Sequence, residues 1–278
     1  MALNTGLQGK VYPWIAYGVT ADALRIYAEA TNETNPLFTG YAPLAPPAFP
    51  IVPAGQSIRA VLGDPELGVN MARLVQGEEE HVFHLPVKAG DQLTVESTLQ
   101  EVHSGDEGEN FTILTTLKNE AGEPAVTLRS LMVIRGGARR AAPAAQAKPA
   151  DSPEAECAFE SSEDVDEDQT YRYAEASGDR NLIHIDPDYA RESAGMPGII
   201  VHGMCTMAFA ARAVLDGAAG SDPGRLERIS VQFSRPVFPG QRLTTRGWNH
   251  TEPGTYRFET VNPRGQAVIK DGIAKISV

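Results

Sequence analysis

Cysteine is scarce in this chain of 278 residues. The two cysteines, Cys157 and Cys205, lie far apart and lack the close spacing of paired metal ligands. Structural zinc sites draw on closely spaced cysteine and histidine pairs. We therefore expect neither a disulfide framework nor a metal site, and predict two free thiols.

Long apolar runs are absent as well. None reaches the roughly 18 residues that a membrane-spanning helix requires. Residues 1–5 also lack the basic-then-apolar order of a secretory signal. We therefore expect no membrane insertion and a cytoplasmic location.

Basic residues are outnumbered, with 24 Lys and Arg against 36 Asp and Glu and a formal net charge of −12. Binding of nucleic acid requires clustered Lys and Arg that neutralise phosphates. We therefore expect no nucleic-acid partner. The charge does not exclude a small ligand such as coenzyme A, because a few local basic residues suffice to hold its phosphates.

The clearest break in the sequence begins at Gly136, where apolar periodicity stops and Ala, Pro and Gly become frequent. Such a composition is typical of a linker. We predict an N-terminal domain of residues 1–136, an Ala/Pro-rich linker of residues 137–153 and a C-terminal domain of residues 154–278. A hydrophobic content of 42% is enough to build a core for each domain.

Two segments of the first half recur in the second half. Residues 27–35 align with residues 173–181, and residues 86–93 align with residues 236–243. The two alignments differ in offset by only four residues. The halves therefore look like one ancestral unit used twice.

Each unit shows a short helix, an irregular polar segment, a second helix and then several strands. The predicted strands are residues 80–85, 92–103, 111–118 and 124–134 in the first half, and 227–237, 242–251, 255–261 and 266–278 in the second. Consecutive strands after a helix indicate an antiparallel sheet.

The segment 201–215 is apolar almost all round, so a helix there has to be buried. We expect it to end at Asp216 and Gly217, because glycine suits a left-handed cap. The corresponding helix of the first half, residues 54–62, is shorter. One such helix wrapped by an antiparallel sheet is the hot-dog arrangement, so the predicted fold class is α+β, a double hot dog.

An acid and an imidazole, Asp179 and His184, lie five residues apart just beyond a helix that Gly178 is placed to end. Both side chains are expected on a loop. Addition of water to a double bond conjugated to a thioester needs a base, a proton source and a donor for the developing enolate oxygen. The pair can supply the first two. The start of the buried helix, near His202 and Gly203, offers free N–H groups as the third.

The run 173–187, followed by Ala190 and by residues 197–203, closely resembles the signature of the MaoC-like R-specific enoyl-CoA hydratases and dehydratases. The resemblance implies that Asp179 and His184 hold the catalytic water. It also implies that the N–H of Gly203 receives the thioester oxygen. Asn181 matches an asparagine of the motif that orients the loop or the pair, and His202 either lines the site or satisfies the helix entrance.

The same resemblance implies a substrate and an assembly. The substrates are trans-2-enoyl and (R)-3-hydroxyacyl thioesters carried by coenzyme A or acyl carrier protein, in fatty-acid or related metabolism. No metal or redox cofactor takes part, and a homodimer is kept open. Leu182 departs from the family's usual proline, but this change removes no reacting group.

The first half departs from the pattern where the chemistry would be. Glu33 stands in place of Asp179, and Phe38 in place of His184. Without an imidazole there is no evident base, so we interpret this half as catalytically inactive. In double hot-dog relatives such a half shelters the acyl chain.

Two other functions stay open. A hot-dog acyl-CoA thioesterase could use Asp179 alone to activate water, although the paired His184 favours a hydratase. A non-catalytic protein that binds acyl thioesters is the other alternative. His81 and His84 lie three apart in a predicted strand and therefore face opposite sides, so we expect packing or surface roles for them.

Overall fold

The computed structural model describes residues 2–105, 108–135 and 156–277. The predicted linker lies outside the described residues. The domain boundaries at 136 and 154 therefore stay predictions.

The described strands form a single antiparallel sheet in the order β1-β3-β4-β5-β2-β7-β10-β9-β8-β6. The strands are β1 (Ile15–Gly18), β2 (Leu74–Phe83), β3 (Gln92–Gly105), β4 (Gly108–Lys118), β5 (Pro124–Ile134), β6 (Phe159–Asp164), β7 (Leu226–Phe233), β8 (Arg242–Asn249), β9 (Thr255–Val261) and β10 (Ala267–Ile276). Counted inward from the two edges of the sheet, the halves have the same strand order. The order β1-β3-β4-β5-β2 of the first half corresponds to β6-β8-β9-β10-β7 of the second. This topology agrees with one unit used twice.

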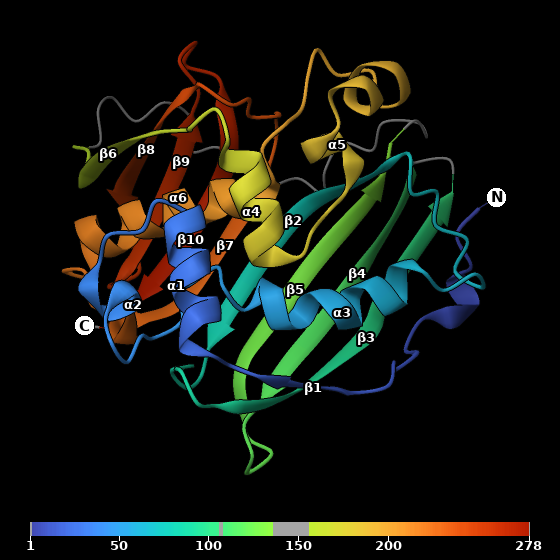
Figure 1. Cartoon of the computed structure of the whole chain (residues 1–278), viewed down its shortest axis with the longest axis horizontal. Coiled ribbons are helices and arrows are strands. Elements are labelled where there is room, and N and C mark those ends of the chain that lie inside the picture. Colours follow the sequence, from blue (N-terminus) through green and yellow to red (C-terminus); the bar gives the residue numbers. More distant parts are fainter. Residues whose placement is uncertain (1, 106–107, 136–155, 278) are drawn as a thin grey trace.

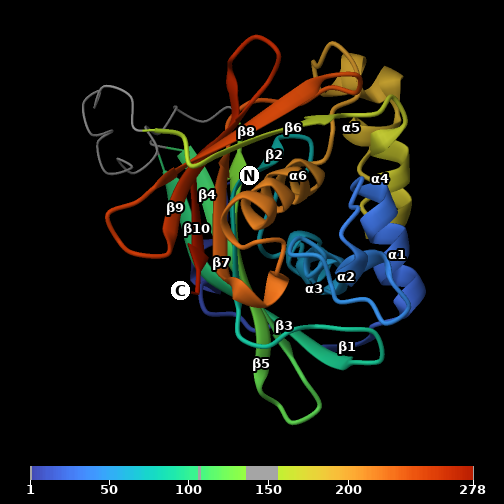
Figure 2. The same cartoon turned by 90° about the vertical axis from the view of Figure 1, so that its left-hand side faces the viewer.

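The helices lie on one face of this sheet (Figure 1). They are α1 (Ala21–Ala30), α2 (Pro36–Thr39), α3 (Ile51–Leu62), α4 (Gln169–Ser177), α5 (Leu182–Ile185) and α6 (Gly203–Ala218), with shorter turns at Thr5–Leu7, Tyr189–Ser193 and Pro223–Arg225. Figure 2 shows α3 and α6 next to the sheet, with α1 and α4 beyond them. Each half thus wraps one central helix, which confirms the predicted double hot dog.

The two halves meet along a pseudo-twofold axis. Strands β2 and β7 pair so that Glu80 lies opposite Ser230, positions that the repeat aligns with each other. On the helical side, the hydroxyls of the aligned Tyr27 and Tyr173 lie 3.4 Å apart. The pairing of the equivalent strands β2 and β7 therefore joins the two halves into one continuous sheet.

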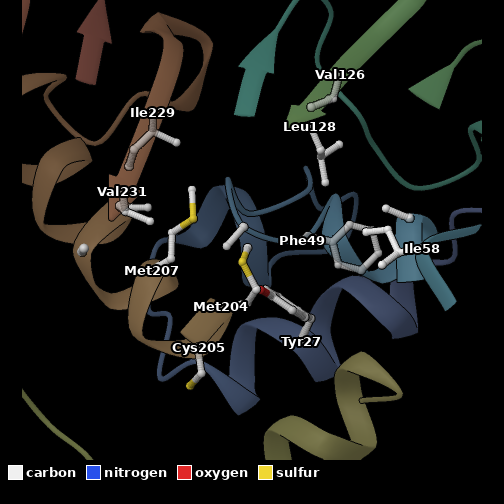
Figure 3. Packing of buried hydrophobic residues seen from close by; sticks show 14 of the residues in the cluster. Tyr27, Phe49, Ile58, Val126, Leu128, Met204, Cys205, Met207, Ile229 and Val231 are labelled. Atoms are coloured by element: carbon white, nitrogen blue, oxygen red, sulfur yellow. The ribbon is translucent and has the colours of Figure 1, made fainter. Parts of the chain in front are cut away.

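The central core lies between α3, α6 and the strands at the seam. Figure 3 shows Met204 and Met207 of α6 directed toward the middle of this core, whereas Cys205 points away from them. All three side chains are buried. Methionine is flexible and fills irregular spaces, which suits these two side chains to the core between the halves.

The predicted strands match the structure best where turns delimit them. β5 and β9 have the predicted bounds, whereas β2 begins six residues before its predicted start at position 80. The sequence analysis missed β1 and β6. β1 has only four residues and both lie at the edges of the sheet, so neither shows a long apolar alternation.

The predicted end of the central helix at Asp216 and Gly217 is wrong. α6 continues to Ala218, and Gly217 is inside it. A Cβ at this glycine would lie 2.4 Å from the Cβ and Cγ of Phe159. Glycine is needed here because strand β6 packs against the helix, not because of a left-handed cap.

The described residues also bear on what we expected of the cysteines and of membrane-spanning helices. Cys157 and Cys205 are both free thiols, the first exposed and the second buried. None of the helices in the described part of the chain is long and apolar enough to cross a membrane.

Candidate active site

The segment after α4 places Asp179 and His184 close together. Gly178 ends α4 with a left-handed φ of 72°, as predicted, and Asp179 follows on a loop. Asn181 then caps α5, because its side-chain oxygen accepts a hydrogen bond from the N–H of Ile183. His184 lies within α5 and not on the loop, so that expectation is wrong. The cap turns the chain back so that the imidazole faces the core.

His184 is held in one tautomer. Its Nδ1 lies 2.8 Å from the carbonyl oxygen of Ile200. A carbonyl only accepts, so Nδ1 carries the hydrogen and Nε2 keeps its lone pair. The side chain is only 9% exposed, and burial lowers the pKa of His184 while the nearby carboxylate of Asp179 opposes that shift. The residue is thus a neutral base near neutral pH.

Asp179 is more exposed than its partner. Its Oδ1 accepts a hydrogen bond from the N–H of Asn181 at 3.1 Å, and its own N–H donates to the hydroxyl of Ser177. These bonds hold the turn on both sides of the carboxylate. Asn181 therefore supports the acid directly, in addition to capping α5.

His202 connects the elements of the site. Its ring stacks on that of His184, with centroids 3.8 Å apart and planes inclined by 25°. Its Nε2 donates to the backbone carbonyl of Asp179 at 3.0 Å, and the ring of Tyr173 lies 4.8 Å from it on another side. Burial and the neighbouring imidazole lower the pKa of His202 to about 3. The residue is neutral and fixes the position of the acid's backbone.

One polar atom from each of Asp179, His184 and His202 lies within 4.8 Å of the other two. Hydrogen bonds span about 2.5–3.2 Å, so one water molecule can contact all three atoms. Two imidazoles and a carboxylate are also a donor set that a divalent metal ion can accept. The buried Nδ1 of His202 has no hydrogen-bond partner among the described residues.

The N-terminus of α6 adjoins this cluster. The helix begins at Gly203 with His202 as its N-cap, and no described side chain caps it. The N–H groups of Cys205 and Thr206 bond to the carbonyl of His202, which leaves the first N–H groups of the helix to other partners. A Cβ at Gly203 would lie 3.3 Å from the ring of Phe233, so glycine keeps this approach open.

The first half repeats the turn without the chemistry. Oε1 of Glu33 accepts hydrogen bonds from the N–H groups of Thr34 and Asn35, and Asn35 caps α2 as Asn181 caps α5. Phe38, which the repeat aligns with His184, is fully buried. Desolvation raises the pKa of Glu33. This turn is a structural copy that lacks the imidazole.

Residues that the sequence analysis did not assign complete the site. Tyr173 supports the ring of His202, the carbonyl of Ile200 selects the tautomer of His184, and Phe233 lies against Gly203. Tyr173 was visible as a repeated residue. A backbone carbonyl and a contact between distant segments leave no signal in the sequence.

The two histidines set aside earlier do not join this cluster. His81 is buried, with Nε2 3.0 Å from Oε1 of Glu79 and Nδ1 3.0 Å from the carbonyl of Pro47. His84 is exposed and contacts Thr127. The two histidines face different environments and cannot share a ligand, as predicted.

Comparisons with known proteins cover both halves of the chain. Residues 148–265 match the family model described as "MaoC like domain", and residues 7–128 match the model described as "FAS1-like, dehydratase domain region". The crystal structure of a MaoC-like dehydratase from Phytophthora capsici superposes with a TM-score of 0.81 at 28% identity, covering 98% of this chain and 97% of that one.

Two curated relatives add sequence similarity. The 3-hydroxyacyl-thioester dehydratase Y of Mycobacterium tuberculosis is 34% identical over 199 residues, which are 69% of this chain and 67% of the relative. The peroxisomal multifunctional enzyme type 2 of Mus musculus is 30% identical over 236 residues, which are 81% of this chain and 31% of that enzyme. The match thus spans about a third of the length of the mouse protein.

Proposed function

This chain belongs to the MaoC-like dehydratase family, and we propose that it reversibly hydrates trans-2-enoyl thioesters to (R)-3-hydroxyacyl thioesters in fatty-acid or related metabolism. It is accordingly a hydro-lyase. The observation that carries the proposal is the cluster of Asp179, His184 and His202 beside the N-terminus of α6. This arrangement places acid–base groups next to free backbone N–H groups.

In the proposed reaction, a water molecule is held by Asp179 and His184. Nε2 of His184 takes a proton from the water as its oxygen bonds to C3 of the substrate. The electrons of the C2–C3 double bond move into the thioester group and form an enolate. The acid–base pair then returns a proton to C2, so the elements of one water are added.

The enolate oxygen requires a donor, and we assign this role to the N–H of Gly203. The N-terminus of the 16-residue helix α6 adds the positive end of its dipole. Such preorganised donors stabilise charge that develops in the transition state. A side chain at this position would press against the ring of Phe233, which lies 3.3 Å from the position that a Cβ would occupy.

The proposed reaction is redox-neutral and needs only acid–base groups, so we propose that no cofactor takes part beyond the carrier of the thioester. Coenzyme A and acyl carrier protein are the two candidate carriers. A homodimer and a cytoplasmic location remain predictions, and sedimentation of the purified chain would test the first.

Two parallel assays test the function on a four-carbon enoyl-CoA. Absorbance of the conjugated enoyl thioester should fall with time, whereas a thiol reagent should detect no release of coenzyme A. Thiol release would identify a thioesterase. Binding of the substrate without either change would identify a non-catalytic acyl-thioester binding protein.

A further inference from the structure

A hollow of about 340 Å³ lies where the end of β7, the turn before β8 and the β9–β10 turn meet. Its lining combines apolar and hydrogen-bonding side chains: Pro197, Pro236, Phe238, Arg235, Gln241, Asn262, Arg264 and Gln266. No acidic side chain is among these lining residues. In a chain with a net charge of −12, the hollow is a local site of positive charge.

Both arginines of the hollow are exposed, and neither has a carboxylate within 4.0 Å in the described part of the chain. Nη1 of Arg235 donates to the carbonyl of Ala267 at 3.1 Å, which anchors its guanidinium at the rim. A guanidinium has five N–H donors, so most of them remain for a ligand. The site therefore offers positive charge that no described acidic partner neutralises.

The turn that carries Arg264 is held by its own hydrogen bonds. Oδ1 of Asn262 accepts from the N–H of Arg264 at 3.0 Å and from the N–H of Gln266 at 3.1 Å. Gly265 completes the turn with a φ of 70°. The backbone that presents Arg264 is thus fixed without using its side chain, which leaves the guanidinium free to bind.

Short chain segments connect the hollow to the catalytic cluster. Ile200 holds His184 through its carbonyl, and the next residue, Val201, donates its N–H to the carbonyl of Val237 at 2.8 Å. On the other side, Phe233 lies against Gly203 and precedes Arg235 by two residues. An elongated ligand with its reacting end at Gly203 can therefore extend toward the two arginines.

We infer that Arg235 and Arg264 bind a phosphate group of the carrier that holds the acyl thioester. Coenzyme A and a phosphopantetheinylated carrier protein share this chemistry, since each joins a phosphate to the pantetheine arm. Arginine forms paired, charge-assisted hydrogen bonds with phosphate oxygens. The inference rests on the proposed function, because it needs the thioester end at Gly203.

The variants Arg235→Gln, Arg264→Gln and their combination test this inference. Arg257→Gln is the matched control, because Arg257 is an exposed arginine of β9 that does not line the hollow. The double variant should raise KM for a four-carbon enoyl-CoA by roughly a hundredfold, about tenfold for each lost charge-assisted contact. We expect kcat to change less than twofold, and the effect on KM to shrink at high salt.

The same enoyl group on pantetheine, which lacks phosphate, is the decisive substrate. Its KM should be the same for the wild type and the double variant. An unchanged KM for the enoyl-CoA would overturn the inference, and so would an equal rise in KM for the pantetheine thioester. Loss of kcat with both substrates would also overturn it, since the arginines would then act on the reaction or the fold.

Two further measurements separate the carriers and the hypotheses. If the double variant is impaired with both an enoyl-CoA and an enoyl carrier protein, the bound phosphate is the one next to pantetheine. Impairment with only one of them identifies that carrier. Calorimetric titration with free coenzyme A needs no turnover, so weaker binding by the double variant supports the inference even if wild-type hydration fails. Equal binding by both proteins contradicts it.

Discussion

At the scale of single residues, the site depends on which nitrogen of each imidazole carries hydrogen. His184 and His202 each donate one ring N–H to a backbone carbonyl, of Ile200 and Asp179 respectively. Each therefore keeps a lone pair on its other nitrogen. Burial favours the neutral form of both rings. The local structure thus prepares a base without a positive charge.

The substitutions Asp179→Asn and His184→Ala test the proposed catalytic pair. Each should lower kcat by about a hundredfold or more, as expected when a general acid–base group is lost. Turnover of a four-carbon enoyl-CoA measures the effect, and an unchanged circular dichroism spectrum shows that the fold is intact. Near-normal turnover by either variant would end the assignment.

The neutral state of His202 predicts a pH-dependent stability. In the unfolded chain a histidine gains its proton near pH 6.5, whereas folded His202 does so only near pH 3. Between these values the unfolded state binds more protons, so the free energy of unfolding falls as pH decreases. The stability that the neutral His202 contributes is therefore fully present above about pH 6.5 and is lost as the pH falls toward 3.

His202→Asn should therefore reduce the loss of stability between pH 7.5 and pH 5, while the amide retains a donor for the carbonyl of Asp179. Urea unfolding at the two pH values measures it. His84→Asn is the control, because His84 is exposed. An equal loss in the wild type and the His202 variant would show that this imidazole is protonated in the fold.

At the scale of elements, α6 has a glycine with a distinct role near each of its two ends. Its first residue, Gly203, carries the N–H that we propose as the donor to the enolate oxygen, and Gly217 lets β6 approach near the other end. At each of these positions a neighbouring aromatic ring occupies the space next to the glycine. The ring is that of Phe233 at Gly203 and that of Phe159 at Gly217. Neither glycine has a positive φ among the described backbone angles, so close packing explains them.

Gly217→Ala should destabilise the fold by about 1–3 kcal/mol, because the new Cβ would overlap Phe159 in a packed core. This cost exceeds the gain in helix propensity of at most about 1 kcal/mol. Gly55→Ala in α3 is the matched control, since its Cβ would meet only the flexible end of Arg59. Urea unfolding should show a loss for the first variant and none for the second.

At the scale of the whole molecule, two copies of one unit have diverged at equivalent positions. The turn of the first half keeps its capping hydrogen bonds but not its imidazole. At the seam, the repeat aligns Glu79 with Ile229 and His81 with Val231, so a buried polar pair faces an apolar one. The shared topology survives both changes, because the backbone pairing does not depend on them.

The interpretation of the first half as catalytically inactive predicts a contrast between two acids. Glu33→Gln should leave hydration of a four-carbon enoyl-CoA near the wild-type rate, because Phe38 beside it provides no base. Asp179→Asn measured in parallel should lose most activity. If both substitutions prove equally damaging, the two halves share one catalytic site.

The polar pair at the seam predicts non-additive stability. His81→Val leaves the buried Glu79 without its imidazole partner and should cost about 3–5 kcal/mol. Glu79→Ile combined with His81→Val copies the second half and should cost clearly less. Urea unfolding of both variants decides this. A double variant less stable than the single one would contradict this prediction.

The sequence by itself determined the features that are local or periodic. Gly178 ends α4 because it adopts a positive φ, and the apolar segment after His202 has to be buried. The internal repeat also predicted the double fold. Each of these follows from residues within a few positions of one another, or from the comparison of two segments.

The tertiary structure decided which distant groups meet. The carbonyl of Ile200 reaches His184 across 16 positions, and His202 reaches Asp179 across 23. Arg235 and Arg264 line one hollow only because β7 and the β9–β10 turn are neighbours in the sheet. Contacts of this kind arise from the packing of whole elements, and neither composition nor periodicity encodes them separately.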